Sequence, residues 1–152
     1  MRIQGSGHIF QVSSLGSRMA SPGLSAYQSA KYAVSGFSSI LAAEVAPLGI
    51  KVTVLEPGGI KTDWAGVSMS TPPVSKAYQP TVGAFAQMIR ELAGNEVSLP
   101  EKIAAIVVDL LEEESPPLRL LVGSDAVEYG GWAGRKLMDE DEKWKELSLS
   151  SV

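Results

Sequence analysis

The sequence Gly-Ile-Lys-Val-Thr-Val-Leu-Glu-Pro-Gly-Gly, residues 49–59, decides how this chain is expected to fold. Its centre, Lys51–Leu55, is rich in β-branched residues, and turn-forming glycine and proline bound it on both sides. This pattern predicts a short strand that ends at Pro57-Gly58-Gly59. The segments on either side of it then determine which kind of sheet the strand joins.

Strands and helices alternate on both sides of that strand. Upstream lie a second short apolar run, His8–Val12, and a helical pattern from about Ser25 to Ala46, closed by Pro47-Leu48-Gly49. Downstream, a helical pattern begins at Ser98-Leu99-Pro100-Glu101, which has the form of a capping box, and a third apolar run covers Leu118–Val122. This order predicts an α/β fold, a partial doubly wound parallel sheet (Rossmann-like) with three strands and crossover helices.

The segment of about residues 63–97 interrupts this alternation. It contains prolines, small residues and scattered large side chains, with one helical pattern from about Thr81 to Ala93. We expect residues 1–152 to form one partial domain, and we expect the few apolar residues of the charged tail, Gly134–Val152, to anchor that tail. Five large side chains of the interrupting segment could line an apolar pocket, with core packing as the simpler alternative: Trp64, Met69, Tyr78, Phe85 and Met88.

Composition and charge argue against several classes of function. The 152 residues carry a net charge of −4 and no basic stripe, which argues against nucleic acid as a partner. The chain has no cysteine and a single histidine, His8, so it cannot form a disulfide or a Cys- or His-rich metal site. The longest apolar run, Ile103–Val108, is too short to cross a membrane. We therefore expect a cytoplasmic protein with no metal ion and no membrane partner.

Tyr27 and Lys31 stand four residues apart in the stretch Ser-Ala-Tyr-Gln-Ser-Ala-Lys, at the start of the first helical pattern. Residues at this spacing lie on one face of a helix, one turn apart. An ammonium beside a phenol stabilises the phenolate and makes the proton easier to transfer, which suits a general acid–base. The alternative is a surface tyrosine above a solvated lysine, and the spacing alone does not decide between the two.

Two further features follow predicted strands, at the edge where open parallel sheets bind ligands. Ser14 follows the first strand, and its hydroxyl could donate a hydrogen bond to a substrate oxygen, whereas Ser13 is better explained as a turn serine. Pro57-Gly58-Gly59-Ile60-Lys61-Thr62 follows the second strand, and its glycines allow the backbone to approach a flat ligand closely. An ordinary turn explains each feature in isolation. Their order along the chain, with Tyr27 between them, favours a single site.

Taken together, these residues resemble the short-chain dehydrogenase/reductase family. The resemblance covers most of the chain and is weak only between Asp63 and Ser98, where that family varies with its substrate. The matching pieces are Gly-His-Ile-Phe-Gln-Val-Ser-Ser at 7–14, Pro22-Gly23, Tyr-Gln-Ser-Ala-Lys at 27–31, residues 49–62, and Gly-Ser-Asp-Ala at 123–126.

The resemblance implies a reaction and a role for each of these residues. Tyr27 would be the catalytic acid–base, Ser14 would hold the substrate oxygen, and Lys31, together with Tyr27, would bind the nicotinamide ribose. The reaction would be hydride transfer between NAD or NADP and a small-molecule carbonyl or alcohol, and the full-length protein would be a homo-oligomer. The turn residues would border the nicotinamide, with the backbone of Ile60 at its carboxamide: Pro57, Gly58, Gly59, Ile60 and Thr62.

The resemblance also has a gap. The family normally begins with a strand, a Gly-rich turn and a helix that seat the cofactor pyrophosphate, and no Gly-x-x-x-Gly-x-Gly occurs in this sequence. The chain thus resembles the carboxyl-terminal half of such an enzyme, without the residue that would select NAD or NADP. Two hypotheses follow. One is a truncated form of a full dehydrogenase, and the other is a non-catalytic dehydrogenase-like module that acts through protein–protein contacts of its exposed sheet.

Overall fold

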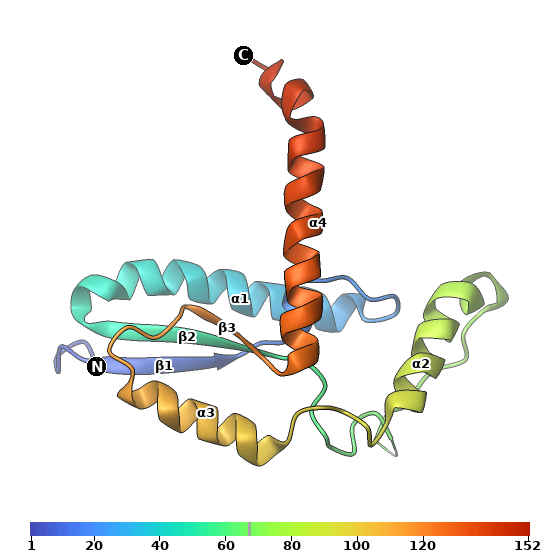
Figure 1. Cartoon of the computed structure of the whole chain (residues 1–152), viewed down its shortest axis with the longest axis horizontal. Coiled ribbons are helices and arrows are strands. Elements are labelled where there is room, and N and C mark those ends of the chain that lie inside the picture. The colour runs from blue at the N-terminus through green and yellow to red at the C-terminus, as the bar shows by residue number, and fades with distance from the viewer. Residues whose placement is uncertain (67) are drawn as a thin grey trace.

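A computed structural model describes residues 1–66 and 68–152 and contains three strands (Figure 1). They are β1 (Gly7–Val12), β2 (Ile50–Pro57) and β3 (Arg119–Val122), in the spatial order β1-β2-β3, and both pairs are parallel. The predicted fold class is confirmed, because the strands form an open, Rossmann-like α/β sheet with helices between them.

β2 is the central strand, and its sequence explains why. Its last six residues are all buried, as expected for the apolar, β-branched run of a parallel strand covered on both faces. The register places Val12 of β1 opposite Leu55, and Val122 of β3 opposite Pro57. The carboxyl ends of the three strands therefore lie at one edge of the sheet, and the loops that follow them begin there.

Helices cover the two faces of the sheet, as Figure 1 shows. α1 (Ser25–Val45) lies along one face and α3 (Pro100–Glu112) along the other, whereas α2 (Ala84–Leu92) lies beyond the carboxyl edge. The apolar stripe of α3 packs on the strands and forms the main core with them, from these residues: Phe10, Leu55, Ile103, Ile106, Val107, Leu110, Leu120 and Val122.

α1 packs on the sheet through small and polar side chains. Gln28, Ser35 and Ser38 are buried, whereas Phe37 and Ile40 are 60% and 65% exposed. Small side chains allow a helix to approach a strand closely, and the hydroxyl of Ser13, directly after β1, reaches the Lys31 carbonyl oxygen and the Ser35 hydroxyl of α1. The start of α1, which carries Tyr27 and Lys31, is fixed to the sheet in this way.

The predicted capping box before α3 is wrong. Leu99, and not Ser98, is the residue that caps α3, and no side chain bonds to the helix start. Ser98 instead forms an isolated parallel bridge with Ile60, in the turn after β2. Ser98, which the local sequence pattern assigned to the start of the helix, is thus used for pairing with a distant segment.

The expectation of an anchored tail is also wrong. α4 (Ser124–Leu149) is one helix of 26 residues that starts after β3 and extends away from the sheet (Figure 1). Leu137, Trp144 and Leu147 are 64%, 50% and 65% exposed, so they do not anchor it. Neither α4 nor another helix of the described residues is long and apolar enough to cross a membrane.

His8 joins the first two strands. Its Nε2 lies 2.9 Å from Thr53 Oγ1, and its ring centre lies 3.9 Å from that of Phe10. Burial, and then the positive charge of Lys51, lower the pKa of His8 from its ordinary value of 6.5. The imidazole is therefore neutral at neutral pH and serves the packing of β1 against β2.

Candidate active site

Lys31 lies between the end of β1 and the ring of Tyr27. Its Nζ donates a 3.0 Å hydrogen bond to the Val12 carbonyl oxygen and lies 5.8 Å from the centre of the Tyr27 ring. The four-residue spacing on α1 places both side chains on the same face of that helix. Tyr27 is 46% exposed, so a ligand can reach its phenol. This is the one hydrogen bond of the Lys31 ammonium among the residues that the structure describes, so two of its N–H groups remain for a ligand.

Ser13 and Ser14 are adjacent but have different surroundings. Ser13 is buried, and its hydroxyl donates to the Lys31 carbonyl oxygen at 3.0 Å and lies 2.8 Å from Ser35 Oγ. Ser14 starts a short 3-10 turn, where its Oγ accepts a 3.0 Å hydrogen bond from the Gly16 N–H. Within the described residues the Ser14 hydroxyl donates to no acceptor, so its proton can serve a ligand.

The side chain of Asp125, in the first turn of α4, holds the turn that follows the buried Pro57. Its Oδ2 accepts a 2.7 Å hydrogen bond from the Gly59 N–H. A Cβ at Gly58 would lie only 2.2 Å from the same oxygen, so only glycine allows the carboxylate to approach there. Sequence reasoning gave Asp125 no role, although the Gly-Ser-Asp-Ala motif at 123–126 marked its position.

Ser98 holds the other side of this turn. Its N–H donates to the Gly59 carbonyl oxygen at 3.1 Å, and its carbonyl oxygen accepts from the Lys61 N–H at 2.8 Å. Ile60 stands between these two bonds, and its N–H has no acceptor in the part of the chain that the structure describes. Thr62 is exposed, with its Oγ1 3.4 Å from the Ile60 carbonyl oxygen. The turn therefore presents a backbone donor at the sheet edge.

A buried carboxylate, Glu56, supports the site and was not predicted. It is fully buried, and it accepts hydrogen bonds from Arg18 Nε at 2.6 Å and from Arg119 Nε at 2.7 Å. Ser17 Oγ also donates to it, at 3.0 Å. These contacts tie the turn that starts at Ser14 to the last part of β2 and to the start of β3. The available clue was an ionisable residue near the end of a mainly apolar strand, because a buried charge needs partners.

The edge of the sheet thus carries several kinds of hydrogen-bonding group. They are an exposed phenol, an ammonium, a hydroxyl and a backbone N–H, from Tyr27, Lys31, Ser14 and Ile60. The segments that carry them are joined by hydrogen bonds: Lys31 of α1 donates to the end of β1, and the Ser13 N–H, next to Ser14, donates to the Leu55 carbonyl oxygen of β2 at 2.8 Å. Such a set can bind sugar hydroxyls and a carbonyl oxygen, and its phenol can give or take a proton.

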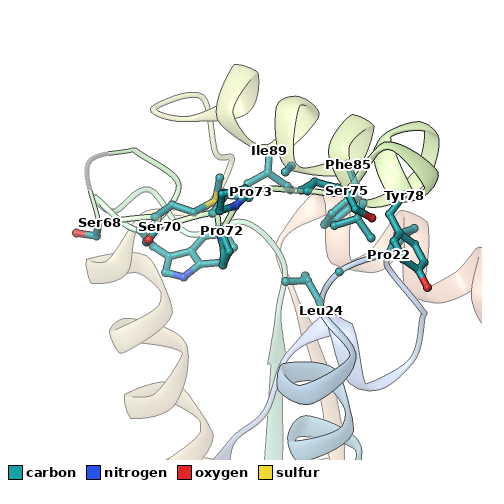
Figure 2. A pocket seen from close by; sticks show the side chains of 17 residues that line it. Pro22, Leu24, Ser68, Ser70, Pro72, Pro73, Ser75, Tyr78, Phe85 and Ile89 are labelled. Carbon is teal, nitrogen blue, oxygen red and sulfur yellow. The ribbon is translucent and has the colours of Figure 1, made fainter.

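An apolar hollow of about 790 Å³ opens beside the start of α1 (Figure 2). Residues 22–24, residues 68–75 and one side of α2 form its walls. Met88, on α2, was a candidate for this pocket, but it does not line the hollow. The other four candidates do line it: Trp64, Met69, Tyr78 and Phe85.

Comparison with known proteins identifies relatives of the whole chain. Residues 1–72 match the family model described as short chain dehydrogenase. Over all 152 residues the chain is 67% identical to a protein of Botryotinia fuckeliana described as oxidoreductase BOA17, and it covers 56% of that protein. A solved short-chain dehydrogenase from Streptomyces avermitilis aligns with 100% of this chain, and the alignment covers 55% of the dehydrogenase. The TM-score is 0.85 and the identity is 33%.

A more distant structure shows the same fold. It is a short chain dehydrogenase from Burkholderia cenocepacia in complex with NADP. The alignment covers 91% of this chain and 47% of that dehydrogenase, with a TM-score of 0.58 and 20% identity. The chain spans about half the length of the relatives it matches, since it covers 56%, 55% and 47% of them.

Proposed function

Because this chain belongs to the short-chain dehydrogenase/reductase family, we propose that it carries the proton-transfer part of the active site of an NAD(P)-dependent oxidoreductase of carbonyl and alcohol groups. The position of Lys31 is the observation that best supports this proposal. Its ammonium donates a hydrogen bond to the Val12 carbonyl oxygen at the end of β1 and lies 5.8 Å from the centre of the Tyr27 ring. A positive charge is thus fixed beside the ring whose phenol would transfer the proton, and the ammonium keeps donors for a ligand.

The proposed roles follow from the free groups of each side chain. Tyr27 gives its proton to the substrate oxygen during reduction and takes it back during oxidation. Ser14 donates its hydroxyl proton in a hydrogen bond to the same oxygen and holds it in place. Lys31 places its positive charge beside the Tyr27 ring, and the Val12 carbonyl oxygen holds Lys31 in position.

The residues present fit the nicotinamide end of NAD or NADP. Lys31 has two free N–H groups for ribose hydroxyls, and the Ile60 N–H can donate to a carboxamide oxygen. Gly58 does not offer an open side to the ring, because the Asp125 carboxylate fills the space that its Cβ would take. When bound, the nucleotide supplies or accepts the hydride.

A chimera tests this function. The amino-terminal half of another family member, which contains the Gly-rich strand, turn and helix, is fused to the amino terminus of the chain at Met1. Consumption of NADH and NADPH is then measured with a reactive ketone. We expect turnover by the chimera and none by the added half alone. A folded chimera that binds nucleotide but has no turnover would contradict the proposal.

The 152-residue chain by itself is expected to bind NAD(H) and NADP(H) only weakly. The contacts that its residues offer are one ribose site at Lys31 and the nicotinamide border at residues 58–62. These few contacts must offset several kcal/mol of association entropy. We therefore expect a dissociation constant of about 1 mM or weaker, roughly −4 kcal/mol, in a calorimetric titration. Saturation at low micromolar nucleotide would show that the chain holds a phosphate site as well.

Ser14→Ala is expected to lower turnover of the chimera by roughly a hundredfold, the usual effect of removing one donor to a reacting oxygen. Ser13→Ala is the matched control, because the Ser13 hydroxyl is buried and hydrogen-bonded to the Lys31 carbonyl oxygen and the Ser35 hydroxyl. The control is expected to lower stability with a much smaller effect on turnover. Equal effects of the two changes on turnover, or the reverse order, would remove Ser14 from the site.

A further inference from the structure

The hollow beside α1 has the size of a small-molecule site. Its volume of about 790 Å³ lies within the range of roughly 300–1,000 Å³ that is usual for ligand pockets. α2 contributes Phe85 and Ile89 to it, and the segment that contains Pro72 and Pro73 runs along α2 (Figure 2). A ligand much larger than a simple ketone can therefore be accommodated.

The walls of the hollow carry no charge among the described residues. Serine, threonine and tyrosine hydroxyls and the indole N–H of Trp64 are the polar side-chain groups there, and the remaining side chains are apolar. Trp64 and Tyr78 are 53% and 61% exposed although they are large rings, so an apolar ligand would remove much of their surface from water. A carboxylate placed against these walls would lose its hydration without gaining a cation.

The hollow adjoins the reacting groups proposed above. Leu24, one of its lining residues, immediately precedes α1, and Tyr27 lies in the first turn of that helix. Figure 2 shows Leu24 at the start of α1, with the hollow between Leu24 and α2. A substrate whose oxygen reaches the Tyr27 phenol can thus extend its other end past Leu24 into the hollow.

We propose that this site takes a carbonyl compound or alcohol with a large, uncharged, apolar body, such as a medium-length alkyl chain or a ring system. This inference rests on the proposed function for the position of the reacting oxygen. Binding of the apolar body requires neither nucleotide nor hydride transfer, so the two proposals can fail separately.

Titration of the 152-residue chain with three ligands tests the proposal, with tryptophan fluorescence as the signal. The ligands are nonanone, oxononanoate, which has the same chain ending in a carboxylate, and acetone. Nonanone is expected to saturate the signal and to bind at least about tenfold more tightly than oxononanoate, because the buried charge has no partner. Acetone is expected to show no saturation. Trp64→Phe should remove the signal, since the other two tryptophans, Trp132 and Trp144, lie on α4.

Matched variants on α2 locate the ligand. Ile89→Glu places a charge in the hollow and is expected to weaken nonanone binding more than about tenfold. Met88→Glu adds the same charge at the preceding position, which is 44% exposed and outside the hollow, and should leave binding unchanged. Equal effects of the two variants would overturn the assignment of the ligand to the hollow.

The comparison of ligands on the unmodified chain decides the proposal even if a variant does not fold. Equal binding of the neutral and charged chains, or no saturation by nonanone, would overturn it. Tighter binding of oxononanoate would also overturn it, and would point to Arg90, which lines a neighbouring hollow of about 420 Å³.

Discussion

Replacing Tyr27 with phenylalanine is expected to lower turnover of the chimera by roughly 10²–10⁴-fold, the usual contribution of a positioned general acid–base. The change keeps the ring beside Lys31 and removes only the hydroxyl that carries the proton. Initial rates with saturating ketone and nucleotide measure the effect. Nucleotide binding should change little, because most of the contacts to the nucleotide come from other groups.

Tyr32→Phe is the matched control for this experiment. Tyr32 lies on the same helix and is 47% exposed, compared with 46% for Tyr27. The control is expected to retain the turnover of the unmodified chimera. A loss of less than tenfold for Tyr27→Phe, about 1.4 kcal/mol of barrier, would count against its role as the acid–base.

Glu56→Gln is expected to lower the free energy of unfolding of the chain by about 3 kcal/mol, because it leaves two arginines without their counter-charge. The carboxylate is fully buried, whereas the side chains of Arg18 and Arg119 are 29% and 33% exposed. Their partial contact with water places the expected loss at the lower end of the range for a broken buried pair. Denaturant titration at neutral pH measures it.

Glu142→Gln is the control for the loss of a carboxylate charge. Glu142 is 73% exposed and pairs with Lys145 at 3.2 Å on the surface of α4. Exposed pairs of this kind contribute about 0–1 kcal/mol, so little change in the free energy of unfolding is expected. A loss for Glu56→Gln no larger than that of the control would show that the buried cluster does not hold the turn that starts at Ser14.

Local sequence patterns predicted the sheet because each strand has its own signal. β2 is a β-branched run between turn residues, and both features act within a few positions of each other. No helix was predicted over α4, which contains Gly130, Gly131 and Gly134, and glycine has a low helix propensity. At Gly130 the reason is packing: a Cβ there would lie 2.8 Å from the side chain of Leu121, so glycine allows α4 to pack on β3.

In the candidate site, too, the contacts between residues close in the sequence could be predicted, and those between distant residues could not. The four-residue spacing of Tyr27 and Lys31 is local, so the sequence predicted that they share a helix face. Glu56 and Asp125 act on partners that are distant in the sequence: Ser17 is 39 residues from Glu56, and Gly59 is 66 residues from Asp125. Only the fold brings these groups together, so spacing could not predict their contacts. The catalytic roles of Ser14, Tyr27 and Lys31 stay predictions.

Tracing the hydride tests the proposed chemistry most directly. The chimera is given a ketone and nicotinamide nucleotide carrying deuterium on the transferable position of C4, and the product alcohol is examined by mass spectrometry and NMR. We predict one deuterium on the carbinol carbon, with Tyr27→Phe lowering the yield and leaving the position of the label unchanged. An alcohol without deuterium, or consumption of nucleotide with no alcohol formed, would contradict hydride transfer at this site.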